Sequence, residues 1–349
     1  MNAVVKVIQP GLQTTVQDQG RIGYQKQGIP VSGPLDRLGL AAANVVVGNA
    51  PGVAGLEIAL MGPTLEIEAG SVRVAVAGGR TELQIISADG ETRIVPALQS
   101  VRLVKGERLR VGAISGSAVG YLAFEGGIDV PPFLGSRSTY VRGAFGGLEG
   151  RALKEADMLE IAQEHATERS ERVLDSLELL PLSEIRVVLG PQHEDFTPEA
   201  ISTLLSTVYV VTQEADRMGL RLDGEKLPHT KSHNIVSDGI APGAIQVPGN
   251  GLPIVLLADR QSTGGYPKIA TVISADLPGL GRVSPGARLR FSSVEIPAAE
   301  AARRDLEALI ASLPSRLGEV RSAAPDLDRL LSANLVSGVV DAMTGEPVA

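Results

Sequence analysis

The residues best suited to chemistry lie between Gln246 and Pro267. This stretch combines amide, carboxylate, hydroxyl and phenol groups with a glycine pair: Gln246, Asp259, Gln261, Thr263, Gly264, Gly265 and Tyr266. Adjacent glycines let backbone N–H groups approach a ligand closely, as in anion-binding nests. We therefore expect a site for a carboxylate, carbamate or phosphate. The alternative is a tight hairpin in which Asp259 and Thr263 bond to the backbone of the turn.

Two further carboxylates each precede an arginine, in Asp36-Arg37 and Asp216-Arg217. Each aspartate could cap a following helical turn, with the arginine at the surface. It could instead transfer protons, while the arginine holds an anionic substrate. Arg137 lies in Gly-Ser-Arg-Ser-Thr-Tyr, whose small residues would let a loop fold over a pocket; plain surface exposure is the alternative.

These residues belong to an internal repeat. Four blocks of the first half recur in order: 36–40 as 216–220, 56–58 as 245–247, 135–140 loosely as 261–266, and 147–153 as 279–283. Glu57 thereby matches Gln246. The offset is 189 residues at Glu57 and 131 at Arg151, which indicates one domain used twice with 58 residues inserted in the first copy. Because the repeated residues are mostly polar or glycine, we expect paired sites facing a common cleft. Shared loop structure is the alternative.

The composition bounds the class of protein. The 349 residues fit two domains, and 44% apolar with 21% charged residues is typical of a globular chain. A net charge of −8 and an aromatic content of 3% argue against nucleic-acid binding. No apolar run reaches membrane-spanning length, and Met1–Lys6 lacks the pattern of a signal peptide. We therefore expect a cytoplasmic protein without a membrane segment.

Absent motifs narrow the chemistry further. The chain has no cysteine, which excludes disulfides and thiolate chemistry. His229 and His233 have i, i+4 spacing, but Pro228 and the missing glutamate argue against a helical zinc site, so we expect no metal. Neither a P-loop for ATP nor a G-x-S-x-G elbow occurs.

Short β-branched runs between frequent turns predict a mainly β protein, a barrel or sandwich rather than alternating βαβ units. Strands are expected over 4–8, 55–68, 72–77, 83–87, 92–95, 100–104, 109–111, 119–124, 185–189, 207–212 and 253–258. We expect a polar loop over 14–24 and a short helix over 36–47. A second helix after Pro297 would end at Pro314, with one apolar face made by Leu306, Leu309, Ile310 and Leu313.

The polar stretch 163–184 predicts a domain boundary. The expected units are a first domain over 1–165 that carries the insertion, a second domain over 185–296, and a helical tail over 297–349. The tail is expected to hold one more helix beyond Pro314.

Ordered motifs then resemble one known family. They are Pro10–Asp18, Gly20–Tyr24, Ser32–Asp36, Ala43-Asn44, Gly48-Asn49, Leu56-Glu57, Gly135–Tyr140, Asp216–Gly219, Gln246–Gly249 and Gln261–Pro267. Together they are similar to the Kip antagonist (KipA) family, whose members are also described as 5-oxoprolinase C subunits, biotin-dependent carboxyltransferases or allophanate hydrolase subunit 2. The resemblance covers about residues 4–292. Ser262 and Asp238 depart from it slightly, where threonine and glutamate are expected.

The resemblance implies two tandem cyclophilin-like β-barrel domains with a few short helices. It also implies two protein partners, one Kip-inhibitor-like and one LamB/YcsF-like, which form a heteromeric complex with this chain. The implied activity is ATP-dependent opening of 5-oxoproline to glutamate, by a chain that is inactive alone. With no P-loop, ATP would bind in an unfamiliar mode or on the Kip-inhibitor-like partner.

Residue roles follow from this implied activity. Arg217 or Arg137 would hold the substrate carboxylate. Asp36, Asp216 and Asp259 would be the catalytic carboxylates, while the amides of Gln246, Gln261, Gly264 and Gly265 would stabilise developing negative charge. Glu57, Thr263 and Tyr266 would complete the substrate site.

Two other functions stay open. The chain could move a carboxyl group from carboxybiotin to urea or a related small amide, with the biotin carried on another protein. It could also be a non-enzymatic regulatory module that binds the Kip-inhibitor-like partner. In each case we expect an apolar partner surface on the helix after Pro297 or on the 126–148 loop, whose apolar residues are Ile128, Val130, Phe133 and Phe145.

Overall fold

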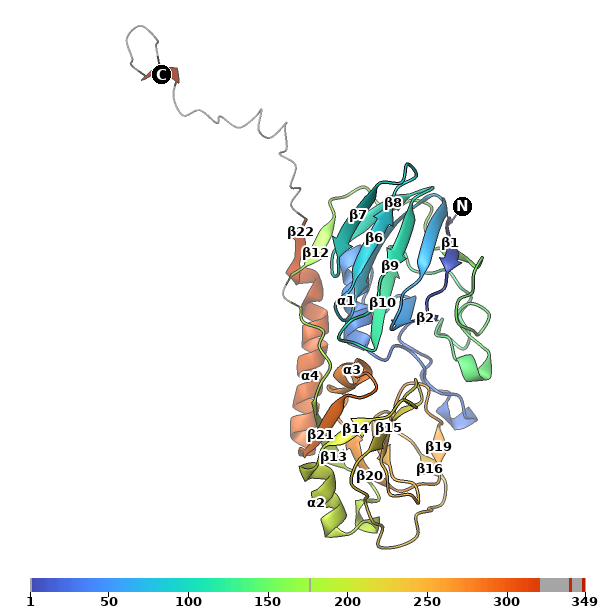
Figure 1. Cartoon of the computed structure of the whole chain (residues 1–349), viewed down its shortest axis with the longest axis vertical. Helices are drawn as coiled ribbons and strands as arrows, with labels where there is room; N and C mark the ends of the chain where they lie inside the picture. Colours follow the sequence, from blue (N-terminus) through green and yellow to red (C-terminus); the bar gives the residue numbers. More distant parts are fainter. Residues whose placement is uncertain (1, 176, 321–338, 341–346, 349) are drawn as a thin grey trace.

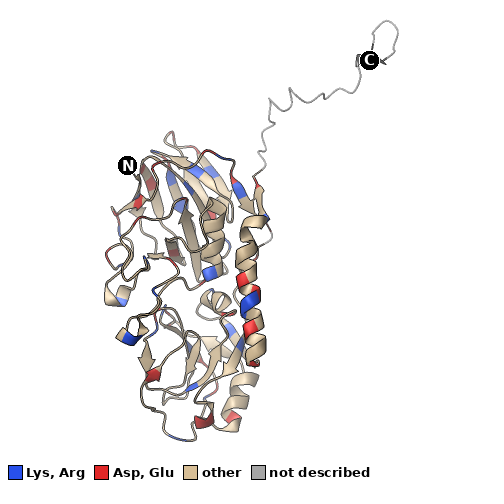
Figure 2. Ribbon diagram, turned by 180° about the vertical axis from the view of Figure 1, so that it is seen from behind, with Lys and Arg blue, Asp and Glu red and all other residues tan. Residues whose placement is uncertain are grey.

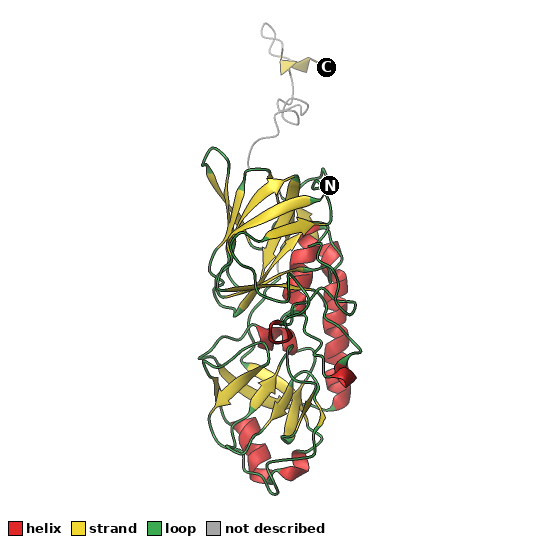
Figure 3. Ribbon diagram, turned by 90° about the vertical axis from the view of Figure 1, so that its right-hand side faces the viewer, coloured by secondary structure: helices red, strands yellow, loops and turns green. Residues whose placement is uncertain are grey.

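The computed structural model describes residues 2–175, 177–320, 339–340 and 347–348. Two β domains are stacked along the long axis of the molecule, and helix α4 (Ile296–Ser312) runs beside both of them (Figure 1). Most of the helical structure lies along one side of the strands (Figure 3). The expected fold class, mainly β with two tandem barrel-like domains and few helices, is confirmed.

The first domain consists of two packed sheets. Its strands are β1 (Ala3–Gln9), β2 (Gln13–Gln17), β3 (Gly55–Ala59), β4 (Thr64–Ala69), β5 (Ser71–Ala77), β6 (Glu82–Ile86), β7 (Thr92–Pro96), β8 (Val101–Val104), β9 (Arg108–Val111), β10 (Val119–Phe124) and β11 (Met158–Ile161). The sheet orders are β11-β1-β4-β9-β6-β7 and β2-β3-β10-β5-β8. Alternation buries Val5 and Val7 in the core between the sheets, while Lys6 between them stays partly exposed.

The second domain is a closed barrel. Its strands are β13 (Glu184–Leu189), β14 (Tyr209–Val211), β15 (Gly219–Asp223), β17 (Ala244–Gln246), β18 (Ile254–Leu256), β20 (Lys268–Val272) and β21 (Arg288–Ser293). The order β13-β20-β17-β18-β15-β14-β21 closes because β13 pairs with β21 in parallel. A separate pair, β16 (Asp238–Gly239) with β19 (Thr263–Gly264), lies outside the barrel sheet. Buried Tyr209 and Phe291 pack in the barrel core with ring centroids 6.1 Å apart.

The helices pack on the outside of the sheets and beside the two domains. α1 (Arg37–Val47) is buried between the five-stranded sheet and the end of α4. The apolar face predicted for α4 is confirmed, because Ile310 and Leu313 are buried in this cluster and Leu306 and Leu309 pack against it. The remaining helices are α2 (Pro198–Ser206), α3 (Leu277–Gly281) and the 3-10 turns η1 (Gln25–Gln27), η2 (Val141–Gly143), η3 (His193–Asp195) and η4 (Leu313–Arg316).

Two sequence-based predictions of elements are wrong. The expected loop over 14–24 begins with strand β2, because the polar side chains of Thr15 and Gln17 are buried and bonded within the fold. The single run expected over 55–68 is two strands, since the chain bends at Leu60, which takes a left-handed φ of 58°. The further helix expected beyond Pro314 lies mostly outside the described residues.

The chain returns to the first domain after completing the second. β12 (Arg172–Leu174) pairs antiparallel with β22 (Leu317–Glu319), and β12 also bridges Gln99 of the first domain. A short pair, β23 (Val339–Val340) with β24 (Pro347–Val348), is also described. Within the described part of the chain, no helix is both long and apolar enough to cross a membrane.

Candidate functional site in the cleft between the domains

The repeated aspartates share one local structure. Asp36 Oδ1 accepts hydrogen bonds from the N–H groups two and three residues on, both at 3.0 Å. Asp216 Oδ1 does the same at 2.7 and 3.2 Å. Each carboxylate therefore caps the turn that follows it. The chain then enters α1 in the first domain and β15 in the second.

Asp36 is also half of a buried ion pair between the domains. Arg282, which follows α3 in the second domain, donates from Nε and Nη2 to the two oxygens of Asp36 at 2.6 and 2.9 Å. Asp36 is fully buried and Arg282 is 5% exposed. With its oxygens used by a cap and an arginine, Asp36 holds the domains together at a point that solvent does not reach.

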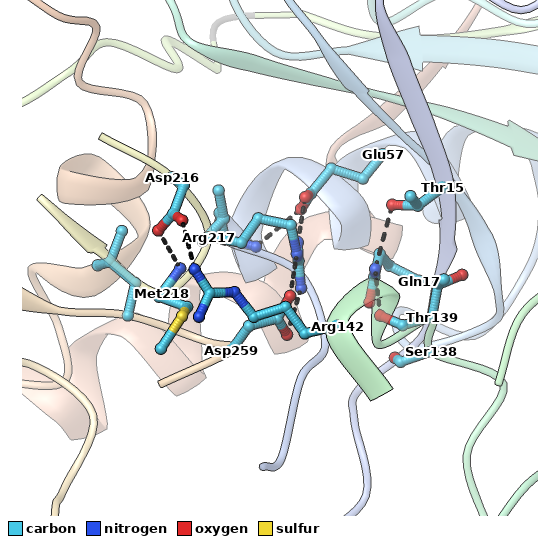
Figure 4. Close-up of polar contacts among 12 residues, drawn as sticks. Thr15, Gln17, Glu57, Ser138, Thr139, Arg142, Asp216, Arg217, Met218 and Asp259 are labelled. Carbon is cyan, nitrogen blue, oxygen red and sulfur yellow. Dashed lines mark hydrogen bonds and ion pairs between the residues drawn. The ribbon is translucent and has the colours of Figure 1, made fainter. Parts of the chain in front are cut away.

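Arg217 makes a second bridge across the cleft. Its Nε and Nη2 donate to Asp259 at 2.8 and 3.2 Å, its Nη1 donates to Glu57, and its Nη2 also donates to the carbonyl of Gly33 at 2.7 Å (Figure 4). Burial alone would lower the pKa of Arg217, but the charges of Glu57 and Asp259 raise it above its ordinary value. Four of its five N–H groups are used, so Arg217 neutralises two carboxylates and offers no free fork to a substrate.

Glu57 is fixed by its own sheet. The strand register sets Thr15, Glu57 and Tyr121 side by side on β2, β3 and β10. The Tyr121 hydroxyl donates to Glu57 at 2.6 Å, and the Leu35 N–H donates to the same oxygen at 2.8 Å. Burial and the charge of Glu57 raise the pKa of Tyr121 well above its ordinary value, so the phenol stays protonated and keeps donating.

Asp259 is a buried carboxylate on the second domain's side of the cleft. It is 5% exposed and lies three residues after β18. Besides bonding Arg217, its charge raises the pKa of two other buried arginines, Arg21 and Arg260, although burial lowers both overall. Asp259 therefore pairs fully only with Arg217 and offsets the charges of Arg21 and Arg260 in part.

A polar cavity of about 410 Å³ opens beside this core. We call it the amide cavity, because Gln246 and Gln261 both line it, together with Tyr266, Asp216 and Arg142. Gly264 brings the two amides together: a Cβ at that position would lie 2.7 Å from Gln246 Nε2 and 3.1 Å from Gln261 Nε2. Gln246 is buried, whereas the side chains of Asp216 and Arg142 are 54% and 64% exposed.

The site residues predicted from the sequence therefore do not all line one cavity, but are divided between two. Gln246, Gln261, Tyr266 and Asp216 share the amide cavity, while Arg217 and Glu57 line a second cavity of about 210 Å³. Asp216 lines both cavities. Thr263 and Gly264 form β19, with Thr263 facing outward. Gly265 follows them, next to the carbonyl of Ile235.

Arg137 lies apart from these residues. Its Nε donates to the Val130 carbonyl at 2.8 Å, and it lines a different cavity of about 740 Å³ beside α4. Its backbone N–H donates to Asp18 at 2.6 Å. Arg137 and Arg217 therefore do not meet at one ligand site.

Arg142 is a site residue that the sequence reasoning missed. It belongs to η2, in the first-domain loop that reaches over the cleft, and its Nη2 lies 3.8 Å from Asp216 of the second domain (Figure 4). The loop is anchored by Asp18, which accepts hydrogen bonds from Ser136 at 2.5 Å and Ser138 at 2.7 Å. The available signal was the small-residue segment ending at Tyr140, two residues before Arg142.

The described residues hold no group of three or more His, Cys, Asp or Glu side chains arranged for a metal ion. His229 uses Nε2 in a 3.0 Å contact with the Val247 carbonyl, and its ring stacks beside Phe196 at 4.8 Å.

Comparison with known proteins identifies the class. Residues 27–293 match the family described as "Carboxyltransferase domain, subdomain A and B". The chain is 36% identical over 320 residues to the C subunit of 5-oxoprolinase from Escherichia coli, covering 90% of this chain and 99% of that protein. The chain therefore belongs to the carboxyltransferase domain family, and the resemblance found in its motifs is confirmed.

Longer proteins contain the same unit. Urea amidolyase of Saccharomyces cerevisiae is 31% identical over 330 residues, which are 88% of this chain but 18% of that protein. The crystal structure of the Kluyveromyces lactis urea carboxylase superposes with a TM-score of 0.80 at 29% identity, over 92% of this chain and 30% of that one.

Proposed function

We propose that this chain is the C subunit of a 5-oxoprolinase, which opens the cyclic amide of 5-oxoproline to give glutamate. The observation that carries the proposal is the share of each relative that this chain matches. The chain matches 99% of the E. coli protein but 18% of yeast urea amidolyase. The amide cavity supports it, since guanidinium, amide and carboxylate groups suit a small lactam that bears a carboxylate. Its volume of about 410 Å³ lies in the ordinary range for small-molecule sites.

Arg142 would hold the substrate carboxylate, because its side chain is 64% exposed and approaches Asp216 only to 3.8 Å. The amide groups of Gln246 and Gln261 would then donate to the ring carbonyl and stabilise the negative charge that develops on its oxygen. Asp216 would accept and return a proton as the ring opens. Arg217 would act indirectly, by fixing Glu57 and Asp259 on either side of the cleft.

Ring opening needs activation, because a lactam carbonyl is a poor electrophile, and the proposal includes ATP. The described residues fit a nucleotide phosphate poorly at α1, since the Asp36 carboxylate already occupies the N–H groups at its start. We therefore assign ATP binding to a partner protein. The proposed partners are a Kip-inhibitor-like protein and a LamB/YcsF-like protein, which would complete the enzyme.

Fewer apolar residues of the 126–148 loop are exposed than the sequence indicated. Ile128 and Val130 are 2% and 4% exposed and belong to the first-domain core. Phe133 is 42% exposed and stacks on Phe145, with centroids 4.7 Å apart. Phe133 is therefore the residue of this loop that we propose for the partner interface. Phe133→Asp should weaken co-purification with the Kip-inhibitor-like partner, while Ile94→Asp, on the remote β7 strand, should not.

The experiment that tests the function is reconstitution. The chain is purified alone and with both co-expressed partners, and 5-oxoproline-dependent glutamate formation and ATP hydrolysis are measured. We expect activity in the full complex and little in the isolated chain. No 5-oxoproline turnover in a stable complex would reject the proposal.

Carboxyl transfer is the second candidate, favoured by the match to urea amidolyase and urea carboxylase. Carboxybiotin would be presented by another protein, and the amide cavity would hold urea or a related small amide. Genes beside this one for a biotin carboxylase and a biotinyl carrier, together with biotin-dependent turnover of urea, would favour it over 5-oxoproline cleavage.

A further inference from the structure

Another cavity between the domains, of about 490 Å³, lies on the α4 side, away from the amide cavity. Its wall is largely apolar, with Ile22, Val31, Leu40, Leu277 and Ile310 among the lining residues. The charged side chains that line it are all arginines: Arg37, Arg260 and Arg303. Within the described chain, no carboxylate lines this cavity.

Arg260 is the most informative of the three. It is 5% exposed, and its Nε and Nη1 donate to the carbonyls of Ile240 and Leu257 at 3.0 and 3.2 Å. Among the described residues it has no ion-pair partner. Burial lowers its pKa to about 10, and the charge of Asp259 only partly offsets this. Asp259 itself bonds Arg217, so Arg260 is a buried cation with unspent capacity for an anion.

Ser32 provides an independent sign of a missing ligand. Its hydroxyl is buried, lines the same cavity and has no hydrogen-bond partner among the described residues. Buried hydroxyls are nearly always hydrogen-bonded, because an unpaired one loses its interaction with water. The Ser32 backbone is fixed nearby, since its N–H donates to the Ala258 carbonyl at 3.2 Å.

The other two arginines come from two helices that meet at the cavity. Arg37 begins α1 and bonds Glu307 of α4 at 2.6 Å, on a partly exposed edge. Arg303 lies on α4, one turn before Glu307, and among the described residues it has no ion pair. Charged residues mark the middle of α4 in Figure 2. One of the three positive charges is thus balanced, and two are not.

We infer that this cavity, which we call the arginine cavity, is a binding site for an oxyanion carried on an apolar body, such as a medium-chain carboxylate or a phosphate ester. Arg260 and Arg303 would bind the oxyanion, Ser32 would donate its hydroxyl, and the apolar wall would cover the body of the ligand. The inference does not rest on the proposed 5-oxoprolinase activity, because none of the amide-cavity residues takes part.

The test is calorimetric titration of the full-length chain with octanoate, 1-octanol and inorganic phosphate. Octanoate combines an oxyanion with an apolar body, and the other two probes each supply one half. We expect one octanoate per chain, bound at least tenfold more tightly than octanol or phosphate, because a charge-assisted hydrogen bond exceeds a tenfold gain. Equal binding of octanol would overturn the anion site, and binding of phosphate alone would overturn the apolar half.

Matched variants locate the site. Arg303→Glu should weaken octanoate at least tenfold, whereas Arg304→Glu, one residue on along α4 and outside the cavity, should change it less than twofold. Ser32→Ala should also weaken octanoate. Arg260→Met is the stronger test but can affect folding, so circular dichroism accompanies it. Equal octanoate affinity in Arg303→Glu and Arg304→Glu would reject the site, whatever the 5-oxoproline assay gives.

Discussion

Arg282 donates two hydrogen bonds to Asp36, at 2.6 and 2.9 Å, across 246 residues of sequence. Both side chains are buried, and the same carboxylate caps α1. The repeat partner of Asp36, Asp216, makes the same cap but is 54% exposed. One sequence motif thus has a buried interdomain role in the first domain and an accessible one in the second.

The first prediction separates the ion pair from the cap. Asp36→Asn keeps a good capping side chain but leaves Arg282 as an uncompensated buried charge, so it should lower the free energy of unfolding by about 3–5 kcal/mol. Asp216→Asn is the matched control and should cost less than about 1 kcal/mol. Urea unfolding monitored by circular dichroism measures both. Similar losses in the two variants would show that the ion pair contributes little.

The second prediction concerns Asp259. The structure buries this carboxylate against Arg217 and near Arg21 and Arg260. The change should therefore destabilise the fold by about 3–5 kcal/mol, as expected when one partner of a buried pair is lost. Activity per folded molecule decides its chemistry: a loss of roughly 10²–10⁴-fold would mark a base. Unchanged specific activity would assign Asp259 to the framework.

The third prediction tests the amide cavity. Gln261 is exposed, so Gln261→Ala should leave stability nearly unchanged. If its amide stabilises the developing negative charge, 5-oxoproline turnover by the reconstituted complex should fall by roughly 10²–10³-fold, the usual effect of removing one such donor. Gln213→Ala, another exposed glutamine outside this cavity, is the control. Equal activity of both variants would remove Gln261 from the site.

The fourth prediction is a pH dependence set by Asp18. Burial raises the pKa of this carboxyl, but hydrogen bonds from Ser136, Ser138 and two backbone N–H groups lower it more, to below the ordinary 3.8. The pKa of Asp18 is lower in the folded chain than in the unfolded chain. Its contribution to the free energy of unfolding is therefore fully present above the unfolded pKa and is lost as the pH falls through the folded pKa. Asp18→Asn lacks it.

The difference in unfolding free energy between wild type and Asp18→Asn should therefore be constant from about pH 6 to 8 and shrink below about pH 4. Urea titrations at several pH values measure it. A difference that does not change down to about pH 3 would mean that the carboxylate is not anchoring the loop that carries Arg142.

Local pattern predicted most of the fold. The strands β5, β6, β7 and β10 and the helix α1 follow from β-branched runs, turn residues and the cap at Asp36. β2 was missed because its buried side chains are polar: Gln17 bonds Thr15 and the Thr139 carbonyl, both at 3.1 Å. A hydrophobicity pattern does not reveal a strand that is buried through hydrogen bonds.

The site was predictable in part. Gln246, Gln261 and Gly264 meet because β17 pairs with β20, with Gln246 opposite Lys268, so that Gln246 lies beside the segment that precedes β20. Arg282 and Arg142 could not be assigned, because their partners Asp36 and Asp216 lie in the other domain. Arg217 looks like a substrate ligand in sequence, yet two carboxylates use its guanidinium. Such contacts depend on how the domains dock, which no local spacing encodes.

The chain enters the second barrel after β12 and leaves it before β22, and these two strands pair with each other, with Leu174 opposite Leu317. Cutting the chain once between Leu174 and Glu184 would therefore not release that barrel. The fragments would remain joined by the return strand, by α4 and by the Asp36–Arg282 contact. A nicked protein should elute as one particle in gel filtration and separate into two fragments only in denaturant, because only non-covalent contacts hold the fragments together.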